Sequence, residues 1–375
     1  MTSHAFHGLG FYWARQCHMP VTQSFSDIPT LNCPLERKLQ QWHTWAAQET
    51  CHRALLGHYI LDGIISQYSG LPTSDRHVTN TMILPSSNAA YEASSVDMWI
   101  QAMITEPQST ITFCQVYTSL FRIGREIDLE LSPFSIRVIL EGLQSLISDN
   151  RQANSFFVGA QDHAAISGAL WRLLDTQINS PAQSKEEKLD LSLRWHAICI
   201  ELCMDSNLTI RHLCQMHSVE QDLYSKSPAF VDIAAWTTTS DARRAVLHAS
   251  AILKLTMELS LGRMQSIHIP FAMMSASIVF LALQSHGITS AATPAVSDWK
   301  RVCFPHDPVV SICDSTLQVD QFLNHSRQVW NLTNNARSFY HNLNTLQAVL
   351  ESLANTWGIA RGMQKIVKCL TEFVV

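Results

Sequence analysis

Residues 34–72 form the longest stretch of this chain with uninterrupted helical spacing. Pro34 suits the first turn, where its missing N–H costs nothing, and Glu36 complements the helix dipole there. Gly70 and Pro72 predict the end of the helix, because glycine takes a left-handed cap and proline cannot continue a helix. A helix of this length, at about 1.5 Å per residue, spans most of a domain. Its apolar side chains recur every three or four residues and share one face: Leu39, Trp42, Trp45, Ala46, Leu56, Tyr59, Ile60 and Ile64.

Two features distinguish this helix from an ordinary amphipathic one. Glu49 precedes Arg53 by four residues, which is the favourable order for an ion pair along a helix. Both residues lie close to the tryptophan stripe, so we expect them to be partly buried and to have partners. Gly57 and Gly63 each cost about 1 kcal/mol relative to alanine, which helices tolerate where another backbone comes close. Taken alone, these residues most simply describe a central core helix.

The spacing of polar and aromatic residues along this helix also carries a resemblance. The positions are Trp42, Trp45, Glu49, Arg53, Tyr59, Ile60, Leu61, Asp62, Ser66, Gly70, Leu71 and Pro72. Their order is similar to the signature of the fungal-specific transcription factor domain, the middle homology region of the xylanolytic-activator type. The chain departs from that signature at Cys51-His52-Arg53, where two arginines are more usual. It also has Gly57 where a larger apolar residue is common.

Two later segments extend the resemblance to about residues 10–285. Leu84-Pro85, the run 91–95 and Trp99 are similar to a Leu-Pro…Trp-x-Ala…Trp segment of members that carry Cys/His zinc fingers. The stretch from Arg243 through His248 to Pro270-Phe271 resembles a later His-Ala…Pro-Phe segment of the family. The order and spacing of these motifs together are more specific than any one of them.

The resemblance implies the regulatory domain of a nuclear fungal transcription factor that controls RNA polymerase II transcription and is not an enzyme. We expect residues 1–290 to be this domain, truncated at its N-terminus, and residues 291–375 to be a helical extension packed on it. The zinc-containing DNA-binding module of the family precedes this domain and is missing here, so DNA is expected as a partner only through that module. Protein partners of the transcription machinery are implied, and a small-molecule inducer and a homodimer are left open.

Composition limits the other classes of function. The chain has 375 residues, of which 46% are hydrophobic and 15% charged, and its net charge is −5. It contains no basic run that could follow a phosphate backbone, which argues against a free-standing nucleic-acid binder. The ten cysteines are scattered, and no charged-then-apolar leader is visible. We therefore expect no signal peptide and expect the thiols to be reduced. The most apolar stretch, 269–283, is shorter than the ~20 residues that cross a bilayer, so no membrane association is expected.

The periodicities predict an all-α fold, a compact array of about a dozen helices without regular repeats. Residues 125–131 alternate polar and apolar side chains but are treated as a connector, because one isolated segment cannot form a sheet. Residues 287–318 are expected to be irregular. The expected helices are 11–18, 34–72, a helix carrying Trp99 and Met103, 112–124, a helix from Pro133 through Leu146, 161–177, 184–204, 208–224, 240–261, 270–284, 318–355 and 357–373.

No catalytic, cofactor-binding or metal-ligating residue is assigned from the sequence. Cys199, Cys203, His212, Cys214 and His217 are the most tempting set, but a two-Cys two-His finger needs about twelve residues before its first histidine, and about eight are present. No nucleophile elbow, His-Glu-x-x-His, dinucleotide or phosphate-loop motif occurs. The alternative function is an all-α enzyme acting on an apolar metabolite. A pocket with converging ionisable groups would favour that enzyme.

Overall fold

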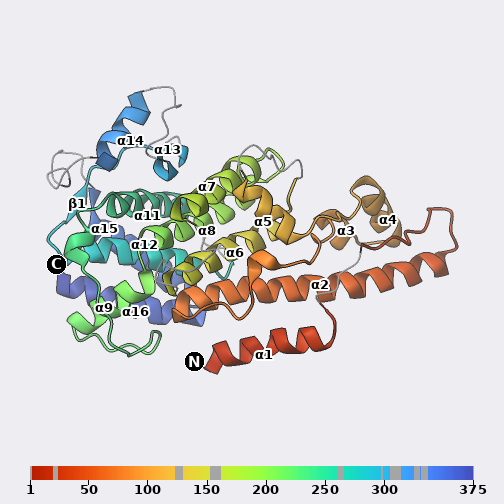
Figure 1. The fold of residues 1–375 in the computed structure, drawn as a ribbon, viewed down its shortest axis with the longest axis horizontal. Coiled ribbons are helices and arrows are strands. Elements are labelled where there is room, and N and C mark those ends of the chain that lie inside the picture. Colours follow the sequence, from red (N-terminus) through yellow and green to blue (C-terminus); the bar gives the residue numbers. More distant parts are fainter. Residues whose placement is uncertain are drawn as a thin grey trace. The chain divides into compact units, whose positions relative to one another are not determined.

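The computed structural model describes residues 2–19, 24–122, 130–152, 162–259, 266–296, 299–304, 314–324, 330 and 337–374. The fold is 70% helical, with sixteen α-helices in these ranges, so the all-α prediction is confirmed (Figure 1). The described strands are one antiparallel pair, β1 (Ser290–Ala291) and β2 (Arg337–Ser338).

Contacts between residues divide the chain into two compact units. The first contains 1–67 and 71–158, and the second contains 68–70 and 159–375. The expected extents of a family domain over 1–290 and an extension over 291–375 stay a prediction. The contacts group 291–375 with 159–290.

Helix α2 (Leu35–Ser69) dominates the first unit and matches the expected 34–72 closely. It ends at Gly70, whose φ of +67° is the left-handed cap that the sequence predicted. Helix α1 (Thr2–Gln16) runs beside it (Figure 1) and is longer than the expected 11–18. The two helices are joined by a hydrogen bond between His58 Nε2 and the His7 carbonyl, 2.9 Å apart. Phe11 also packs on Tyr59 with ring centroids 4.8 Å apart.

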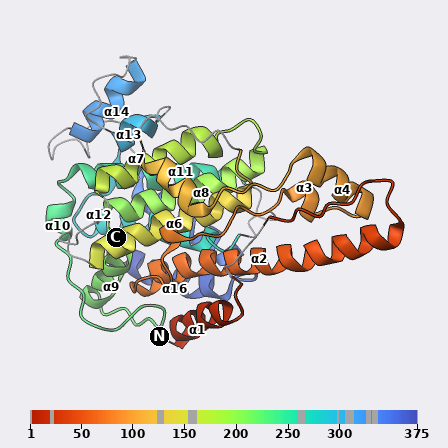
Figure 2. The same ribbon diagram turned by 45° about the vertical axis from the view of Figure 1, so that its right-hand side comes forward.

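Two short helices cover the N-terminal half of α2 (Figures 1 and 2). They are α3 (Asn88–Tyr91) and α4 (Val96–Thr105), capped by the hydroxyls of Ser87 and Ser95. Trp45 of α2 and Trp99 of α4 form the centre of this cluster, with ring centroids 5.5 Å apart. The 3₁₀ turn η1 and two helices complete the first unit: η1 (His77–Thr79), α5 (Phe113–Phe121) and α6 (Pro133–Gln152).

The two interior glycines of α2 behave differently. A Cβ on Gly63 would lie 2.7 Å from the Cβ of Glu141 and 3.2 Å from its carbonyl oxygen, so α6 comes close there, as the sequence predicted. A Cβ on Gly57 would meet nothing within 4 Å, so the same prediction is wrong at that position.

Helix α12 (Ile269–Gln284) is the core of the second unit, and every one of its residues is buried. It packs against α8 (Lys185–Cys203), α11 (Ser240–Glu258), α15 (Phe339–Leu353) and α16 (Gly358–Val374) (Figure 1). The buried helix expected over 270–284 is therefore confirmed. No helix in the described ranges has the length and apolar character needed to cross a membrane. The other elements are α7 (His163–Leu173), the π turn η2 (Leu174–Ile178), α9 (Ser206–Met216), α10 (Ile233–Trp236), α13 (Trp299–Cys303) and α14 (Asp314–Asn324).

Several boundaries differ from the sequence predictions. The helix expected over 208–224 ends at Met216, because Ser218 takes a φ of +51° and the Val219 N–H bonds back to the Cys214 carbonyl at 2.8 Å. The expected irregular crossing 287–318 contains α13 and the start of α14, and the helix expected over 318–355 is two helices, α14 and α15. Most of 125–131 lies outside the described residues.

Candidate functional site

The ion pair predicted on α2 is buried and holds the segment that follows Leu84-Pro85. Arg53 Nε donates to Glu49 Oε1 at 2.7 Å, and the Glu49 side chain is 2% exposed. The same carboxylate accepts from the N–H of Ser86 at 3.1 Å and from its hydroxyl at 3.2 Å. Arg53 Nη2 donates in turn to the Ser86 carbonyl at 2.7 Å. The expectation that Glu49 and Arg53 are at least partly buried and have partners is confirmed.

Other residues of the motif join the same network. Arg53 Nη1 lies 3.5 Å from Asn88 Oδ1, and the guanidinium stands 4.1 Å from the ring centroid of Tyr91. Trp45 Nε1 donates to the Ser86 hydroxyl at 3.4 Å, and its ring packs on Trp99. Residues far apart in the sequence motif therefore form one contiguous cluster. Ser86 and Asn88 were not singled out from the sequence, although both closely follow Leu84-Pro85.

The electrostatics of Glu49 suit a structural role. Burial by itself raises the pKa of this carboxyl. The adjacent His52, whose Nδ1 lies 3.8 Å from Oε2, and the hydrogen bond from Arg53 outweigh burial and hold the pKa below its ordinary value. A general acid working near neutral pH needs the opposite shift. Glu49 is thus a fixed anion that organises its neighbours.

A second buried carboxylate, Asp62, lies further along α2. It accepts from the N–H of Ser74 at 2.9 Å, from the N–H of Asp75 at 3.2 Å and from His77 Nε2 at 3.2 Å. His7 Nε2 of α1 lies 3.5 Å away. Burial raises the pKa of Asp62, and the hydrogen bonds from His77 and Ser74 outweigh it, so the pKa is lowered. The Asp of the motif therefore anchors the loop after α2.

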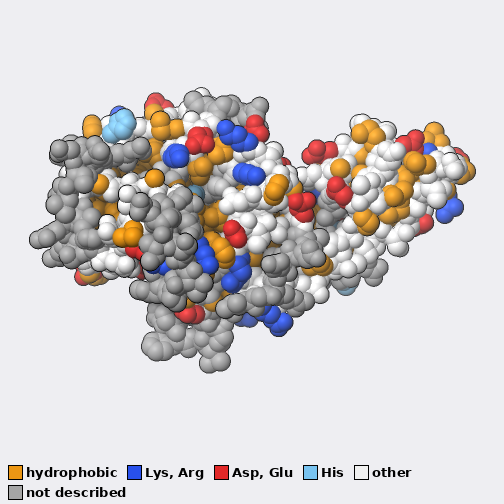
Figure 3. Space-filling view, turned by 90° about the horizontal axis from the view of Figure 1, so that it is seen from above, with side chains coloured by type: hydrophobic (Ala, Val, Ile, Leu, Met, Phe, Trp, Pro, Cys, Tyr) orange, Lys and Arg blue, Asp and Glu red, His pale blue; other side chains and the backbone are white. Residues whose placement is uncertain are grey.

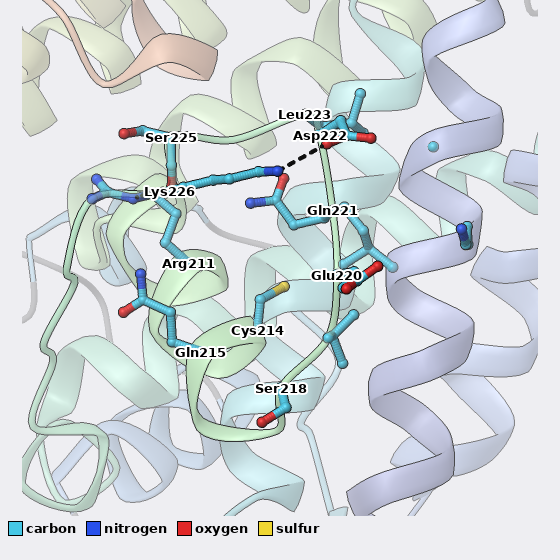
Figure 4. A pocket seen from close by; sticks show the side chains of 14 residues that line it. Arg211, Cys214, Gln215, Ser218, Glu220, Gln221, Asp222, Leu223, Ser225 and Lys226 are labelled. Atoms are coloured by element: carbon cyan, nitrogen blue, oxygen red, sulfur yellow. Dashed lines mark hydrogen bonds and ion pairs between the residues drawn. The ribbon is translucent and has the colours of Figure 1, made fainter.

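The second unit holds a cavity of about 560 Å³ between α9, α16 and the loop that follows α9 (Figure 4). Of the five charged side chains that line it, those of Arg211, Asp222 and Lys226 have partners. Arg211 donates from Nε to the Ser225 carbonyl at 3.1 Å and from Nη2 to the Ser227 carbonyl at 2.7 Å. Lys226 Nζ lies 3.2 Å from Asp222 Oδ1. These contacts shape the loop and leave Arg211 fixed on it.

The cysteines among the candidate zinc ligands of 199–217 lie on two helices. Cys199 and Cys203 belong to α8, and Cys214 belongs to α9 and lines the cavity of Figure 4. Burial raises the pKa of Cys199 well above its ordinary value and that of Cys214 to about 12. Because zinc binds thiolates, such burial is typical of structural cysteines.

The two histidines of that set have other contacts. His212 Nδ1 lies 3.1 Å from the Ala229 carbonyl, and His217 stacks on Phe373 with ring centroids 5.6 Å apart. Within the described part of the chain, no three metal-ligating side chains form a group that could hold an ion. The expectation that the chain holds no zinc stays a prediction.

A histidine pair that sequence reasoning missed lies in the core of the second unit. His196 Nδ1 of α8 and His248 Nδ1 of α11 are 2.9 Å apart, and Trp299 stacks on His248 at 4.9 Å. Burial lowers the pKa of His196 to about 3. Burial, with His196 and Arg244 as further causes, lowers that of His248 well below its ordinary value. The resemblance includes His248 in its His-Ala…Pro-Phe segment, but among 17 histidines no sequence signal paired it with His196.

Comparisons with known protein families, curated proteins and solved structures find no match to this chain. A functional conclusion therefore rests on the residues and geometry of the chain itself. Two arrangements bear on it: the buried motif network of α2 and the cavity of the second unit.

Proposed function

We propose that this chain is the regulatory domain of a fungal transcription factor, acting in the nucleus on RNA polymerase II transcription. The observation that carries the proposal is the convergence of the motif residues. Trp45, Glu49 and Arg53 of α2 meet Ser86 and Trp99, which lie in or next to the later Leu-Pro…Trp segment. Any buried carboxylate needs partners, but here the partners come from the segment that carries the later part of the resemblance.

The contacts within the cavity of Figure 4 bear on the enzyme alternative, although five charged side chains line it. An enzyme needs converging groups whose pKa values are adjusted toward the working pH. In this cavity Arg211 donates its hydrogen bonds to loop carbonyls, and Lys226 pairs with Asp222. Burial raises the pKa of the Cys214 thiol to about 12, far above a neutral working pH. The proposal therefore assigns no catalytic residue.

The charge distribution suits partners other than bare DNA. On the face drawn in Figure 3, Lys and Arg side chains are scattered among Asp and Glu. Arg243 and Arg244, the densest basic pair in the sequence, are both engaged: Nε of the first donates to the Leu323 carbonyl at 2.9 Å, and Nη1 of the second donates to Asp241 at 2.8 Å. Specific DNA contact in this proposal belongs to a separate module, and the partners of this chain are proteins of the transcription machinery.

A fusion experiment tests the proposal. A foreign DNA-binding module attached to the chain should change transcription of a reporter that carries its binding site in a fungal host. The module alone and the module with an unrelated helical protein of similar length serve as controls. A folded, nuclear fusion that leaves the reporter unchanged would count against the regulatory function and favour the enzyme.

Electrophoretic mobility-shift assays test separately the expectation that this chain alone does not bind DNA specifically. The bare chain should give no sequence-dependent shift at moderate salt, because its 26 Lys and Arg are outnumbered by 31 Asp and Glu and phosphate binding depends on displacing counterions with cations. A tight shift that discriminates between duplexes would contradict this expectation.

A further inference from the structure

One side of α1 carries a stripe of large apolar side chains that the rest of the chain leaves uncovered. Four residues, between 49% and 68% exposed, make up this α1 patch: Phe6, Leu9, Tyr12 and Trp13. At about 100° per residue, these positions fall within an arc of about 120° on the helix. The opposite side of α1 is buried. Scattered exposed apolar residues are ordinary, but a contiguous stripe of this kind marks an interaction surface.

The helix that carries the α1 patch is already held in place by the first unit. His58 Nε2 lies 2.9 Å from the His7 carbonyl, and Arg15 Nη2 lies 2.7 Å from Asp75 Oδ2. These contacts tie α1 to α2 and to the loop that follows α2. A partner that docks on the patch therefore meets a formed helix, which lowers the entropic cost of association.

The charge of the α1 patch determines which kind of partner fits. None of its four residues is charged, and Ala5 and Gln16, the exposed neighbours on the same side of the helix, are also neutral. An acidic or basic protein surface would find no complementary charge here. An anionic membrane surface is bound through Lys and Arg, which the patch lacks. A second copy of the same patch fits without placing like charges opposite one another.

The order of the side chains suits a two-fold dimer in which the two α1 helices run antiparallel. In a two-fold interface the same patch must face itself. Phe6 and Trp13 lie about 10.5 Å apart along the helix axis, with Leu9 between them. A two-fold axis between positions 9 and 10 places Phe6 of each copy opposite Trp13 of the other. An aromatic pair then closes each end, and the two leucines meet near the axis.

The area of the α1 patch fits a weak dimer. A large aromatic side chain buries about 150–250 Å² when it is fully covered, so the exposed parts of the four side chains amount to roughly 400 Å². A specific interface needs about 500 Å² per partner. The patch therefore supplies the apolar centre of such an interface, and a polar rim around it supplies the remainder. An interface of this size has a dissociation constant on the order of 10 µM.

We propose that the α1 patch is a homodimer interface, in which two copies of this chain pack their α1 helices antiparallel. Phe6 and Trp13 are the paired contact residues, and Leu9 lies at the two-fold axis. The proposal depends on the exposure, charge and spacing of residues on α1, and it holds whether or not the chain regulates transcription.

Sedimentation velocity of the full chain tests the dimer. Between about 1 µM and about 200 µM, the parent chain should pass from mostly monomer to mostly dimer. Phe6→Glu and Trp13→Lys should each weaken association at least about tenfold, because each replaces an aromatic contact with a charge that must lose its water. Ile104→Glu is the matched control, since Ile104 is 60% exposed on α4 of the same unit and lies outside the patch. This control should dimerise like the parent.

A mixture of the two patch variants tests the antiparallel arrangement. In a mixed pair, Phe6 of the Trp13→Lys copy meets the unchanged Trp13 of the Phe6→Glu copy, and the two introduced charges, which are opposite in sign, face each other. The equimolar mixture should therefore associate more tightly than either variant alone. Far-ultraviolet circular dichroism should be the same for all variants, because every substituted side chain is exposed.

The outcomes that contradict the proposal are distinct. A parent chain that stays monomeric at about 200 µM would overturn it, including the case in which the patch binds a different protein. A dimer that survives both patch substitutions, or that Ile104→Glu weakens equally, would assign the interface to another surface. A mixture that associates no more tightly than its components would refute the antiparallel pairing of Phe6 with Trp13.

Discussion

The two interior glycines of α2 give a prediction in which the same substitution has opposite signs. Gly57→Ala adds a methyl group where nothing lies within 4 Å. Gly63→Ala places one 2.6 Å from Glu141 Oε2, 2.7 Å from the Cβ of that residue and 3.2 Å from its carbonyl oxygen. The carboxylate could rotate away, but the Cβ and the backbone of α6 could not move without shifting the helix.

The magnitudes follow from this geometry. Glycine in a helix interior costs about 0.8–1.0 kcal/mol relative to alanine, so Gly57→Ala should raise the free energy of unfolding by about 0.5–1 kcal/mol. Gly63→Ala gains the same helix propensity but meets a steric cost of about 1–3 kcal/mol, the usual scale of overpacking. Glu141 is 1% exposed, which leaves little room for relaxation. The difference of the two terms is a lowering of the free energy of unfolding by up to about 2 kcal/mol for Gly63→Ala.

Urea denaturation followed by far-ultraviolet circular dichroism measures both variants against the parent chain. The midpoints should move in opposite directions, with similar dependence on urea concentration. Gly63→Ala stabilising as much as Gly57→Ala would refute the reasoning, because it would mean that α6 does not approach α2 at that point.

Three further predictions follow from the two cores and the cysteines. Trp45→Ala should lower the free energy of unfolding by about 3–5 kcal/mol, because the ring is 2% exposed. The control Trp13→Ala, at 63% exposure, should change it by less than about 0.5 kcal/mol. Similar denaturation midpoints for the two variants would contradict this prediction. The low pKa values of His196 and His248 imply stability that is fully present above the ordinary histidine pKa of about 6.5 and is lost as pH falls below it. Replacing both with glutamine should therefore flatten the melting temperature between pH 7 and pH 5, and an unchanged slope would argue against neutral buried rings. Chelators should not reduce helicity, and stoichiometric zinc whose removal unfolds the chain would overturn the interpretation of 199–217.

The central helix was predictable because its signals are local. Apolar spacing, a proline before the first turn and a glycine at the end fix α2 within a few residues. The burial of Glu49 and Arg53 followed from their position beside the tryptophan stripe. Helix α12 was equally clear, since a helix that is apolar on all sides must be covered on all sides.

What the sequence did not predict depends on distant partners. Nothing near Ser86 indicates that it pairs with two α2 residues more than thirty positions earlier. The difference between Gly57 and Gly63 comes from α6, which follows much later in the chain. The cavity beside α9 was not predictable, because it is formed by segments whose proximity is set by packing. Helix α9 ends earlier than predicted because Ser218 adopts a left-handed backbone conformation. A serine in the sequence does not indicate that conformation.

The burial of α12 has a consequence for how the chain emerges from the ribosome. Once α12 has left the exit tunnel, α8 and α11 are already outside the ribosome, but α15 and α16 have not yet emerged. One side of the most apolar helix in the chain is then uncovered, which is the kind of surface that chaperones bind and that drives nascent chains to aggregate. Stopping translation after residue 290 should leave that surface bare permanently, and the shortened product should be recovered in inclusion bodies. Supplying 339–374 as a separate co-expressed segment is the natural remedy, since those residues form the two missing covers.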